Sequence, residues 1–395
     1  MQLPRALLLL GASTLVCGGS PARFPEAVIA ARAEAALLGM IVSDAAAMPL
    51  HWQYSQAAIK RLVGAGSPEF FSPPQNLWYK GKEGGSTPYG QQALAYLAVG
   101  GQPGGFQPAA VQDAYWALYN PATCPGPSGG WYLDGSTKEF VQNYQGGQRY
   151  PHSGGNDAQA DAAAHAVIVA ALLGGNTSAL LDALEPVIRV TQDTAEAAAF
   201  GAAAARLFER LLVYNYSSPA AAVADTVADL RSASRAHPFT QDAAMADAME
   251  AAAAAAASGE ASASFILRTG QSCDYFFTLP NVAFLTALLG SGVEDFVSGA
   301  RQNVRRVPHS SCRFLPRPPS LTLYHCLPPP PPLSTLRAAQ ILAGGDSGSR
   351  GCFLGAIQGA RLGDKALLPA DWVAKTTAYA QVLPLAAALV ARRGA

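Results

Sequence analysis

The stretch that decides the fold reads Gly39-Met-Ile-Val-Ser43-Asp44-Ala-Ala-Ala47-Met-Pro49-Leu-His51-Trp52-Gln-Tyr54. Residues 25–47 begin with a proline, are rich in helix formers and contain no later proline, which predicts a helix that Pro49 brings to an end. Small residues recur in it at every fourth position and therefore share one face: Gly39, Ser43 and Ala47. Such a face lets a second backbone approach closely.

A single carboxylate, Asp44, lies beside this face in apolar surroundings. Burying a carboxylate is costly unless a partner compensates for it. Two interpretations follow. Asp44 either ties down a neighbouring loop, or it belongs to a functional site at the helix end, where His51 follows in the turn.

A glycine-rich turn at residues 344–350 precedes a second helix that carries small residues. Its glycines also recur at every fourth position: Gly351, Gly355, Gly359 and Gly363. A glycine costs about 1 kcal/mol relative to alanine inside a helix, so four on one face indicate a close helix contact. We predict that the two small-residue helices pack together and bring Asp44, His51 and Asp346 towards one place.

Composition favours one large all-α domain, which we expect over residues 24–395. Half of the 395 residues are hydrophobic and only 14% are charged, alanine is abundant and runs of β-branched residues are few. The net charge is zero, and Lys and Arg are scattered, which argues against a nucleic-acid partner. After the N-terminal region, we find no segment of 18 uninterrupted apolar residues, so we expect no membrane span.

About a dozen helices are predicted from apolar periodicity and breaks at Gly and Pro. Ser136 is the candidate cap of the helix that follows residue 134. The expected helices cover residues 25–47, 56–63, 93–99, 107–119, 158–173, 178–191, 194–213, 219–233, 240–257, 278–289, 293–304, 350–362 and 369–392.

Two segments stand apart from this helical pattern. Residues 1–20 form a candidate signal or targeting segment, because Arg5 precedes an apolar run. We expect a secreted or organellar protein if this segment is cleaved, and a cytoplasmic one otherwise. Residues 307–337 contain nine prolines and interrupt the domain. They are either a polyproline linker or a retained intron in the gene model.

The six cysteines form no CxxC pair and no cluster with zinc spacing. Cys273 has no base adjacent in sequence, so core packing is favoured over a nucleophilic role. His165 lies on an apolar helix and is expected to be a core histidine whose hydrogen bonds are satisfied.

Several motifs, in order, resemble those of the ADP-ribosylglycohydrolase family. They are Gly39-x-x-x-Ser43-Asp44-Ala-x-x-x-Pro49, Ser153-Gly-Gly155-Asn156, and Gly344-Gly345-Asp346-x-x-Ser349 with the glycine helix after it. Asp-Gly-Ser-Thr-Lys at 134–138 and Tyr-Gly-x-Gln at 89–92 are similar to the branch that holds the J-crystallins and selenoprotein J. The resemblance covers residues from about 30 to 390.

The resemblance implies an all-α bundle with a two-magnesium site that cleaves ADP-ribose from a side chain or small acceptor. Mg²⁺ requires oxygen ligands, mostly carboxylates and water. The family's glutamate position falls here on His51, its Thr-Asp-Asp run on residues 89–92, and its Asp-x-Asp-Thr run on residues 346–349. We therefore expect a degraded metal site, in which magnesium is at most weakly held.

The candidate site residues follow from these matches. The candidate metal ligands are Asp346 and Ser349, with Asp44 and the neutral Gln91 beside them. The catalytic candidates are Asp346 and His51. His51 is either a general base or a buried histidine bonded to Asp346.

The candidate substrate-binding residues are Ser153, Gly155, Asn156, Asp157 and Tyr89. Asn156 and Asp157 follow a glycine turn at a helix start, which suits either an anion or ribose site or an ordinary helix cap. Tyr89, Trp52 and Tyr54 either stack on an adenine or belong to the core.

Three functions stay open on the sequence alone. The first is a family member that binds ADP-ribose or a related nucleotide with little or no hydrolysis. The second is an active glycohydrolase that uses one metal or none. The third is a structural, crystallin-like protein without a ligand.

Overall fold

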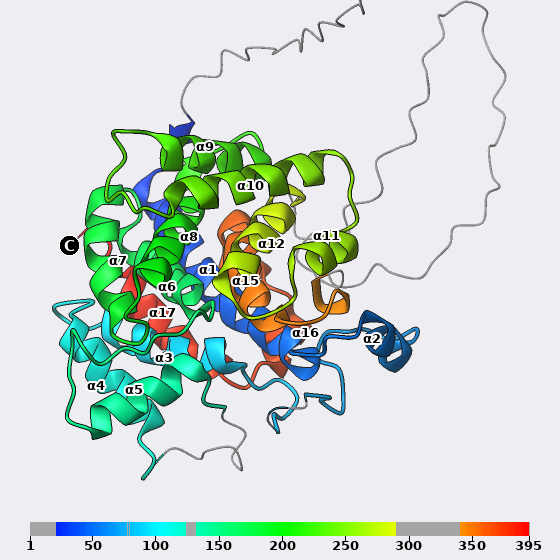
Figure 1. The fold of residues 1–395 in the computed structure, drawn as a ribbon, viewed down its shortest axis with the longest axis horizontal. Helices are drawn as coiled ribbons and strands as arrows, with labels where there is room; N and C mark the ends of the chain where they lie inside the picture. The colour runs from blue at the N-terminus through cyan, green and yellow to red at the C-terminus, as the bar shows by residue number, and fades with distance from the viewer. Residues whose placement is uncertain (1–20, 77, 79, 124–131, 290–339, 395) are drawn as a thin grey trace, which may run out of the picture.

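Helix α1 (Glu26–Ala47), which corresponds to the helix predicted at residues 25–47, runs through the middle of the molecule (Figure 1). It follows Pro25 and leads at Met48 into a short 3-10 turn that contains Pro49, η1 (Met48–Leu50). Every residue from Ala35 to Ala47 is buried. A helix that is apolar on all sides in this way belongs to the centre of a large core.

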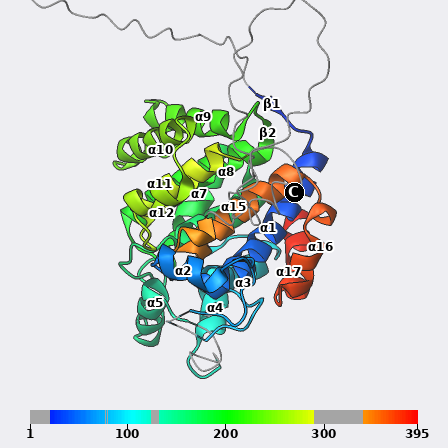
Figure 2. The same cartoon turned by 90° about the vertical axis from the view of Figure 1, so that its right-hand side faces the viewer.

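The predicted partner of α1 is α15 (Ser347–Leu362), and the two helices lie side by side at the centre of both ribbon views (Figures 1 and 2). A Cβ placed at Gly39 would lie 2.5 Å from the Gly355 carbonyl oxygen, and one at Gly355 would overlap the Gly39 carbonyl and the Ser43 side chain. The small faces predicted from the sequence therefore form this contact, and the prediction is confirmed.

The computed structural model describes residues 21–76, 78, 80–123, 132–289 and 340–394. The candidate signal segment at 1–20, the expected helix at 293–304 and the proline-rich segment at 307–337 lie outside these residues. The other elements are β1 (Ala22–Arg23), α2 (Gln56–Val63), α3 (Pro88–Gly100), α4 (Pro108–Tyr119), α5 (Gly135–Gln145), α6 (Asp161–Leu173), α7 (Thr177–Arg189), α8 (Ala195–Val213), β2 (Tyr214–Asn215), α9 (Pro219–Arg231), α10 (Asp242–Ala257), α11 (Ser262–Thr269), α12 (Tyr275–Ala287), η3 (Lys365–Leu367), α16 (Ala370–Lys375) and α17 (Tyr379–Val390).

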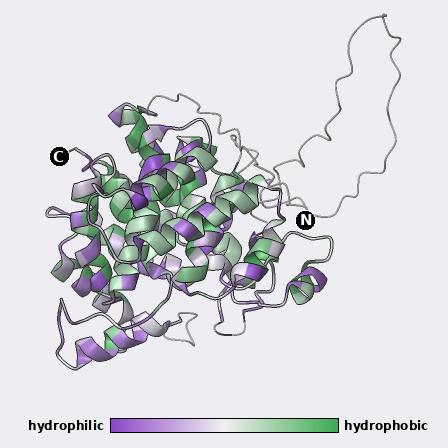
Figure 3. Cartoon of the chain, turned by 45° about the horizontal axis from the view of Figure 1, so that its top comes forward, coloured by the Kyte–Doolittle hydropathy of each residue, from purple (hydrophilic) through white to green (hydrophobic). Residues whose placement is uncertain are grey.

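The remaining helices surround the central pair. Helices α6 and α8 pack against each other and against α1 and α15, while α9, α10 and α12 form a group beyond α8. Helices α4 and α5 project at the opposite end of the molecule (Figure 2). Hydrophobic colour dominates the central helices in Figure 3, and the stronger hydrophilic colour lies on outer helices. Among the described residues, no helix combines the length and apolar character needed to cross a membrane.

The all-α prediction is confirmed, because the described strands are only the two-residue pair of β1 and β2. Three local expectations were wrong. The helix expected at 158–173 begins at Asp161, because the Ala160 N–H donates to the Cys273 carbonyl and the Ala158 carbonyl accepts from Tyr275. Residues before Asp161 are thus held by another segment instead of the helix.

The helix expected at 369–392 is divided into α16 and α17. Between them the backbone N–H and hydroxyl of Thr377 both donate to the Gly84 carbonyl, at 2.9 and 3.0 Å. The cap of α5 is also different, since the Asp134 carboxylate, and not Ser136, accepts the Thr137 N–H at 2.8 Å. Helix α11 was not predicted.

Candidate functional site

Asp346 lies at the N-terminus of α15, directly after a turn that only glycines form easily. Gly344 and Gly345 have φ of 78° and 69°, in the left-handed region, and a Cβ on either would run into neighbouring backbone. The turn directs the Asp346 carboxylate inwards, where it accepts hydrogen bonds from the Tyr89 hydroxyl at 3.0 Å and from the Ser349 hydroxyl. The side chain is fully buried.

Burial makes the charged form of the Asp346 carboxyl group less favourable. Burial raises its pKa to about 6, against the opposing effects of the Ser349 hydroxyl, the Arg350 guanidinium and the Tyr89 hydroxyl. Arg350 is itself fully buried and donates to the carbonyls of Gln340 and Gly344, at 3.1 and 2.6 Å. It therefore holds the segment that leads into the Asp346 turn, a role that the sequence motifs did not indicate.

His51 comes close to Asp346 but does not form an ion pair with it. The Gly348 N–H donates to His51 Nδ1 at 3.0 Å, so Nδ1 is a hydrogen-bond acceptor and Nε2 carries the ring proton. Burial, and then the Arg350 charge, hold the pKa of His51 well below its ordinary value, so the ring is neutral. The 3.5 Å approach of Nδ1 to Asp346 Oδ1 therefore joins two acceptors. Of the two interpretations of His51, the buried histidine matches its surroundings, but Nδ1 accepts its hydrogen bond from the α15 backbone instead of bonding to Asp346.

Asp44 binds the start of α3. Its carboxylate accepts the Thr87 N–H at 2.9 Å, the Thr87 hydroxyl, and a weak bond from the Cys352 thiol at 3.4 Å. Burial raises the pKa of Asp44 to about 7 despite these donors. A Cβ at Gly90 would overlap this carboxylate, which explains the glycine there. Of the two interpretations of Asp44, these contacts match the one in which it ties down a neighbouring segment.

The residues of α3 divide between two sides of the helix. Tyr89 points to Asp346 and is fully buried. Its ring plane makes an angle of 76° with that of His51, and the two ring centroids are 5.9 Å apart. Gln91 instead donates to the Ser86 carbonyl at 3.3 Å and lines a different pocket, of about 340 Å³, with Lys80 and Lys82. Tyr89 and Asp346 are thus brought together, and Gln91 faces elsewhere.

The donor set does not fit a two-magnesium centre. Among the described residues, no group of three or more His, Cys, Asp or Glu side chains is arranged to hold a metal ion. The oxygens of Asp346 and Asp44 already accept protein hydrogen bonds from Tyr89, Ser349 and Thr87. The Tyr89 phenol beside Asp346 donates a hydrogen bond. A further carboxylate in its place would have supplied negative charge for a second magnesium ion.

The candidate substrate loop, residues 153–157, is anchored by its own backbone and side chains. The Ser153 hydroxyl donates to the Val190 carbonyl at 2.9 Å, and Gly155 exchanges backbone hydrogen bonds with Thr191 and Asp193. The Asn156 N–H donates to the Glu139 carboxylate at 2.7 Å, while its side chain is exposed. Ser153 and Gly155 thus hold the loop. The Asn156 side chain is accessible, whereas Asp157 is half-buried and its Oδ2 is enclosed by protein.

Residues 271–275 connect this loop to the Asp346 turn. The Gln271 carbonyl accepts the Asp346 N–H at 2.8 Å, and the Cys273 carbonyl accepts the Ala160 N–H at 2.8 Å. Burial, followed by the charges of Asp346 and Asp157, raises the pKa of the Cys273 thiol well above its ordinary value. A protonated thiol between carboxylates is a poor nucleophile. This segment carries no motif, and only its backbone hydrogen bonds reveal its role.

Aromatic side chains lie around His51. The ring of Trp52 lies 4.4 Å from that of His51, 5.0 Å from Tyr132 and 6.3 Å from Trp78, measured between centroids. Trp52 is buried, whereas Trp78 and Tyr54 are 58% and 44% exposed. Of the three expected stacking residues, Trp52 and Tyr89 therefore belong to the interior, and Tyr54 is accessible.

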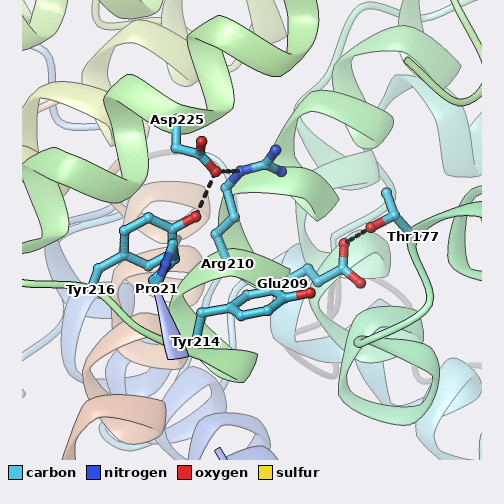
Figure 4. Close-up of a pocket in the computed structure, with 7 residues that line it drawn as sticks. All are labelled: Pro21, Thr177, Glu209, Arg210, Tyr214, Tyr216 and Asp225. Carbon is cyan, nitrogen blue, oxygen red and sulfur yellow. Dashed lines mark hydrogen bonds and ion pairs between the residues drawn. The ribbon is translucent and has the colours of Figure 1, made fainter. Parts of the chain in front are cut away.

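A separate pocket of about 250 Å³ lies where β2 meets α8 and α9 (Figure 4). Asp225 in it accepts from Arg210 Nε at 2.7 Å and from the Tyr216 hydroxyl at 2.5 Å. Glu209 accepts from the Thr177 hydroxyl and the Gly175 N–H, at 2.6 and 2.7 Å. The carboxylates of this pocket are therefore used to join elements of the fold.

The helical fold, the glycine turn at Asp346 and the loop at 153–157 define the class of protein. The family model for ADP-ribosylglycohydrolase matches residues 25–395, and the chain belongs to this family. Among solved structures, a chain of an "ADP-ribosylglycohydrolase-related protein complex" superposes with a TM-score of 0.56 at 15% identity, covering 92% of this chain and 98% of that one. That similarity shows the fold.

Two crystallins of Tripedalia cystophora are similar in sequence. Crystallin J1A is 29% identical over 195 residues and crystallin J1B 28% over the same length. Each match covers 46% of this chain and 59% of the crystallin, so less than two thirds of either crystallin is matched.

Proposed function

We propose that this protein binds ADP-ribose or a related nucleotide, with little or no hydrolysis of ADP-ribosylated molecules. The observation that carries the proposal is the closure of the Asp346 centre, in which the carboxylate is fully buried and accepts hydrogen bonds from Tyr89 and Ser349. Family membership supplies the substrate class, since the family acts on ADP-ribosylated molecules.

The state of His51 supports the absence of efficient hydrolysis. A general base must offer a lone pair to the attacking water. The lone pair of Nδ1 already accepts the Gly348 N–H, and the ring is fully buried. Activation of water requires a general base or a bound metal ion. Among the described residues, Asp346 has neither an accessible base nor a suitable set of metal ligands beside it.

The accessible parts of the site support ligand binding. The Asn156 side chain reaches solvent on the loop that residues 271–275 connect to the Asp346 turn. The exposed Tyr54 offers an aromatic face of the kind that bases stack on. The proposal therefore places ligand contacts on this loop and on Tyr54, away from the closed carboxylate.

Calorimetry with ADP-ribose, with and without Mg²⁺, tests the proposal together with an assay for release of ADP-ribose from a modified peptide. We expect binding that does not require Mg²⁺, with no release above background. Metal-dependent binding with turnover would instead establish a working hydrolase.

A pair of variants locates the binding. Asn156→Ala is expected to weaken ADP-ribose binding by about tenfold, the effect of losing one hydrogen bond to a ligand. The control is Gln102→Ala, a truncation at an exposed position whose backbone carbonyl, and not its side chain, accepts a bond from Arg392. Equal affinities of the two variants would remove the loop from the site.

The similarity to crystallins J1A and J1B favours one other function, a structural protein without a ligand. The same calorimetry decides between the two. No heat of binding with ADP-ribose at millimolar concentration, from a protein that unfolds cooperatively, would favour the structural function.

A further inference from the structure

A buried cluster beneath the candidate substrate loop holds two carboxyl groups against one hydroxyl. Ser136 Oγ lies 2.5 Å from Asp161 Oδ2 and 3.1 Å from Asp134 Oδ1. Asp134 caps α5, Asp161 is the first residue of α6, and all three side chains are buried. The sequence motifs drew attention to residues 134–138 but gave these contacts no role.

Counting hydrogens shows that this arrangement needs an additional proton. The Ser136 hydroxyl has one hydrogen and can donate it to only one of the two carboxyl groups. The other contact would then join two lone pairs at hydrogen-bond distance, which is repulsive unless that carboxyl group is protonated. One of the two aspartates must therefore donate to Ser136.

The other contacts assign the proton to Asp161. Asp134 accepts the Thr137 N–H at 2.8 Å and the Gln92 amide at 2.5 Å, and such donors stabilise a carboxylate. Asp161 Oδ1 has no hydrogen-bond partner among the described residues. Burial, and then the charge of Asp134, raise the pKa of Asp161 well above its ordinary value.

The titratable groups that face Asp161 are mainly acidic or neutral. His165, one turn further along α6, is neutral because burial lowers its pKa to about 3. Groups on the elements packed against Asp161 are Tyr89 and Tyr96 of α3, Tyr115 of α4, Asp134 before α5, and Asp157 and Cys273 of the two neighbouring loops. None of these supplies a positive charge that would favour an Asp161 carboxylate.

The cluster also holds the candidate substrate loop. The Gly135 N–H donates to Gln159 Oε1 at 2.9 Å, and the Gly135 backbone lies so close to the Asp157 carboxylate that a Cβ there would overlap it. The first turn of α5 therefore contacts the loop through Gly135 and α6 through the Ser136 hydroxyl. Moving this turn would move Asp157.

We propose that Asp161 keeps its proton in the folded protein and, by donating to Ser136, is a positioning residue for the ligand loop at 153–157. This inference rests on the proposed binding function for the effect on the ligand, but not for the shared proton. The proton chain runs from Asp161 to Ser136 and from Ser136 to the Asp134 carboxylate.

The test compares Asp161→Asn with Asp161→Ala. Asparagine can donate to Ser136 at every pH, whereas alanine cannot donate at all. The control is Asp247→Asn, which removes a carboxylate that is 73% exposed and paired with Arg231. Unfolding equilibria and ADP-ribose affinity are measured for each protein between pH 4 and 9.

The folded-state pKa of Asp161 is raised above its unfolded value of about 3.9, so its contribution to stability is complete below that pH and is lost as pH rises. Relative to Asp161→Asn, the unfolding equilibrium constant of the wild type should rise by up to about tenfold per pH unit above pH 4. The infrared difference spectrum between the wild type and Asp161→Asn should also show the carbonyl band of a protonated carboxyl group, because the bands of Asp44 and Asp346 are common to both proteins and cancel. Matching pH profiles of the wild type and Asp161→Asn, with no such band, would overturn the shared proton.

The ligand measurements separate the two parts of the inference. Asp161→Asn should bind ADP-ribose as the wild type does at low pH, and Asp161→Ala about tenfold more weakly. Equal binding by Asp161→Ala and the wild type would overturn the positioning role. If neither variant nor wild type binds ADP-ribose but the proton signature is present, the proposed function fails and the shared proton stands.

Discussion

Single residues decide the chemistry of the Asp346 centre. The sequence placed Asp346, Ser349 and Tyr89 as candidates, and the structure brings all three together. The tautomer of His51 could not be predicted, because it depends on a partner that lies far away in the sequence, the Gly348 N–H. The expectation that the hydrogen bonds of His165 are satisfied was wrong, since neither of its ring nitrogens has a partner among the described residues.

Tyr89→Phe tests how far the phenol stabilises the buried carboxylate. Removing the hydroxyl takes one donor from Asp346, so we expect a loss of about 1–3 kcal/mol in the free energy of unfolding, measured in urea. Tyr144→Phe is the matched control, since its hydroxyl makes only a 3.4 Å contact to the exposed Asp113. Similar losses in both variants would contradict a special role of Tyr89.

The complete burial of His165 predicts that the fold loses stability in acid. It is fully buried against Tyr96, with 3.8 Å between ring centroids, and neither ring nitrogen has a partner among the described residues. Its folded pKa of about 3 lies below the unfolded value of about 6.5, so its contribution to stability is complete above pH 6.5 and is lost as pH falls towards 3.

His165→Leu should therefore lose less stability than the wild type between pH 6.5 and pH 4, by several kcal/mol at the acid end. Thermal unfolding across this range measures the difference. His152→Leu, at an exposed position, should leave the pH profile of the wild type unchanged. Parallel profiles for His165→Leu and the wild type would refute this prediction.

Helices were predicted best where local pattern decides them. The four-residue repeats of Gly39 and Gly355 indicated the contact of α1 with α15 because a close approach needs small side chains on both helices. The breaks at residues 158–160 and 376–378 were missed. They are imposed by Cys273 and Gly84, through hydrogen bonds that leave no local mark in the sequence.

Gly355→Ala tests the helix contact directly. The new Cβ would overlap the Gly39 carbonyl and the Ser43 side chain, so we expect a destabilisation of about 1–3 kcal/mol by chemical denaturation. Gly146→Ala, at the exposed C-terminal end of α5, has a nearest approach of 3.4 Å and should change stability by less than about 1 kcal/mol. A neutral Gly355→Ala would show that the helices can separate without cost.

At the scale of the whole molecule, the candidate site is assembled from segments far apart in the chain. Resemblance to the family located the motifs at 39–51, 153–157 and 344–349, and the structure joins the last two through residues 271–275. That connection could not be predicted, because it consists of backbone hydrogen bonds, which any sequence can make. Arg350 escaped notice for a similar reason, since it binds carbonyl groups.

The whole-molecule response to magnesium is expected to be small. A ligand that binds only the folded state raises the melting temperature by an amount that grows with the logarithm of the ligand concentration divided by the dissociation constant. Because the carboxylates of Asp44 and Asp346 are already bonded to protein donors, millimolar Mg²⁺ or EDTA should shift the melting temperature by less than about 1 °C. Ca²⁺ is the control for an unspecific effect of divalent ions, and a shift of several degrees with Mg²⁺ alone would restore a specific site.

The contact of α1 with α15 has a consequence for folding during protein synthesis. The two helices lie roughly three hundred residues apart in sequence, yet each supplies the other's innermost surface. Until α15 has left the ribosome, α1 carries an apolar face without its partner, and the Asp346 turn has nothing to close upon. The centre of the molecule is therefore completed last during synthesis, and the nascent chain depends on protection from aggregation for most of its translation.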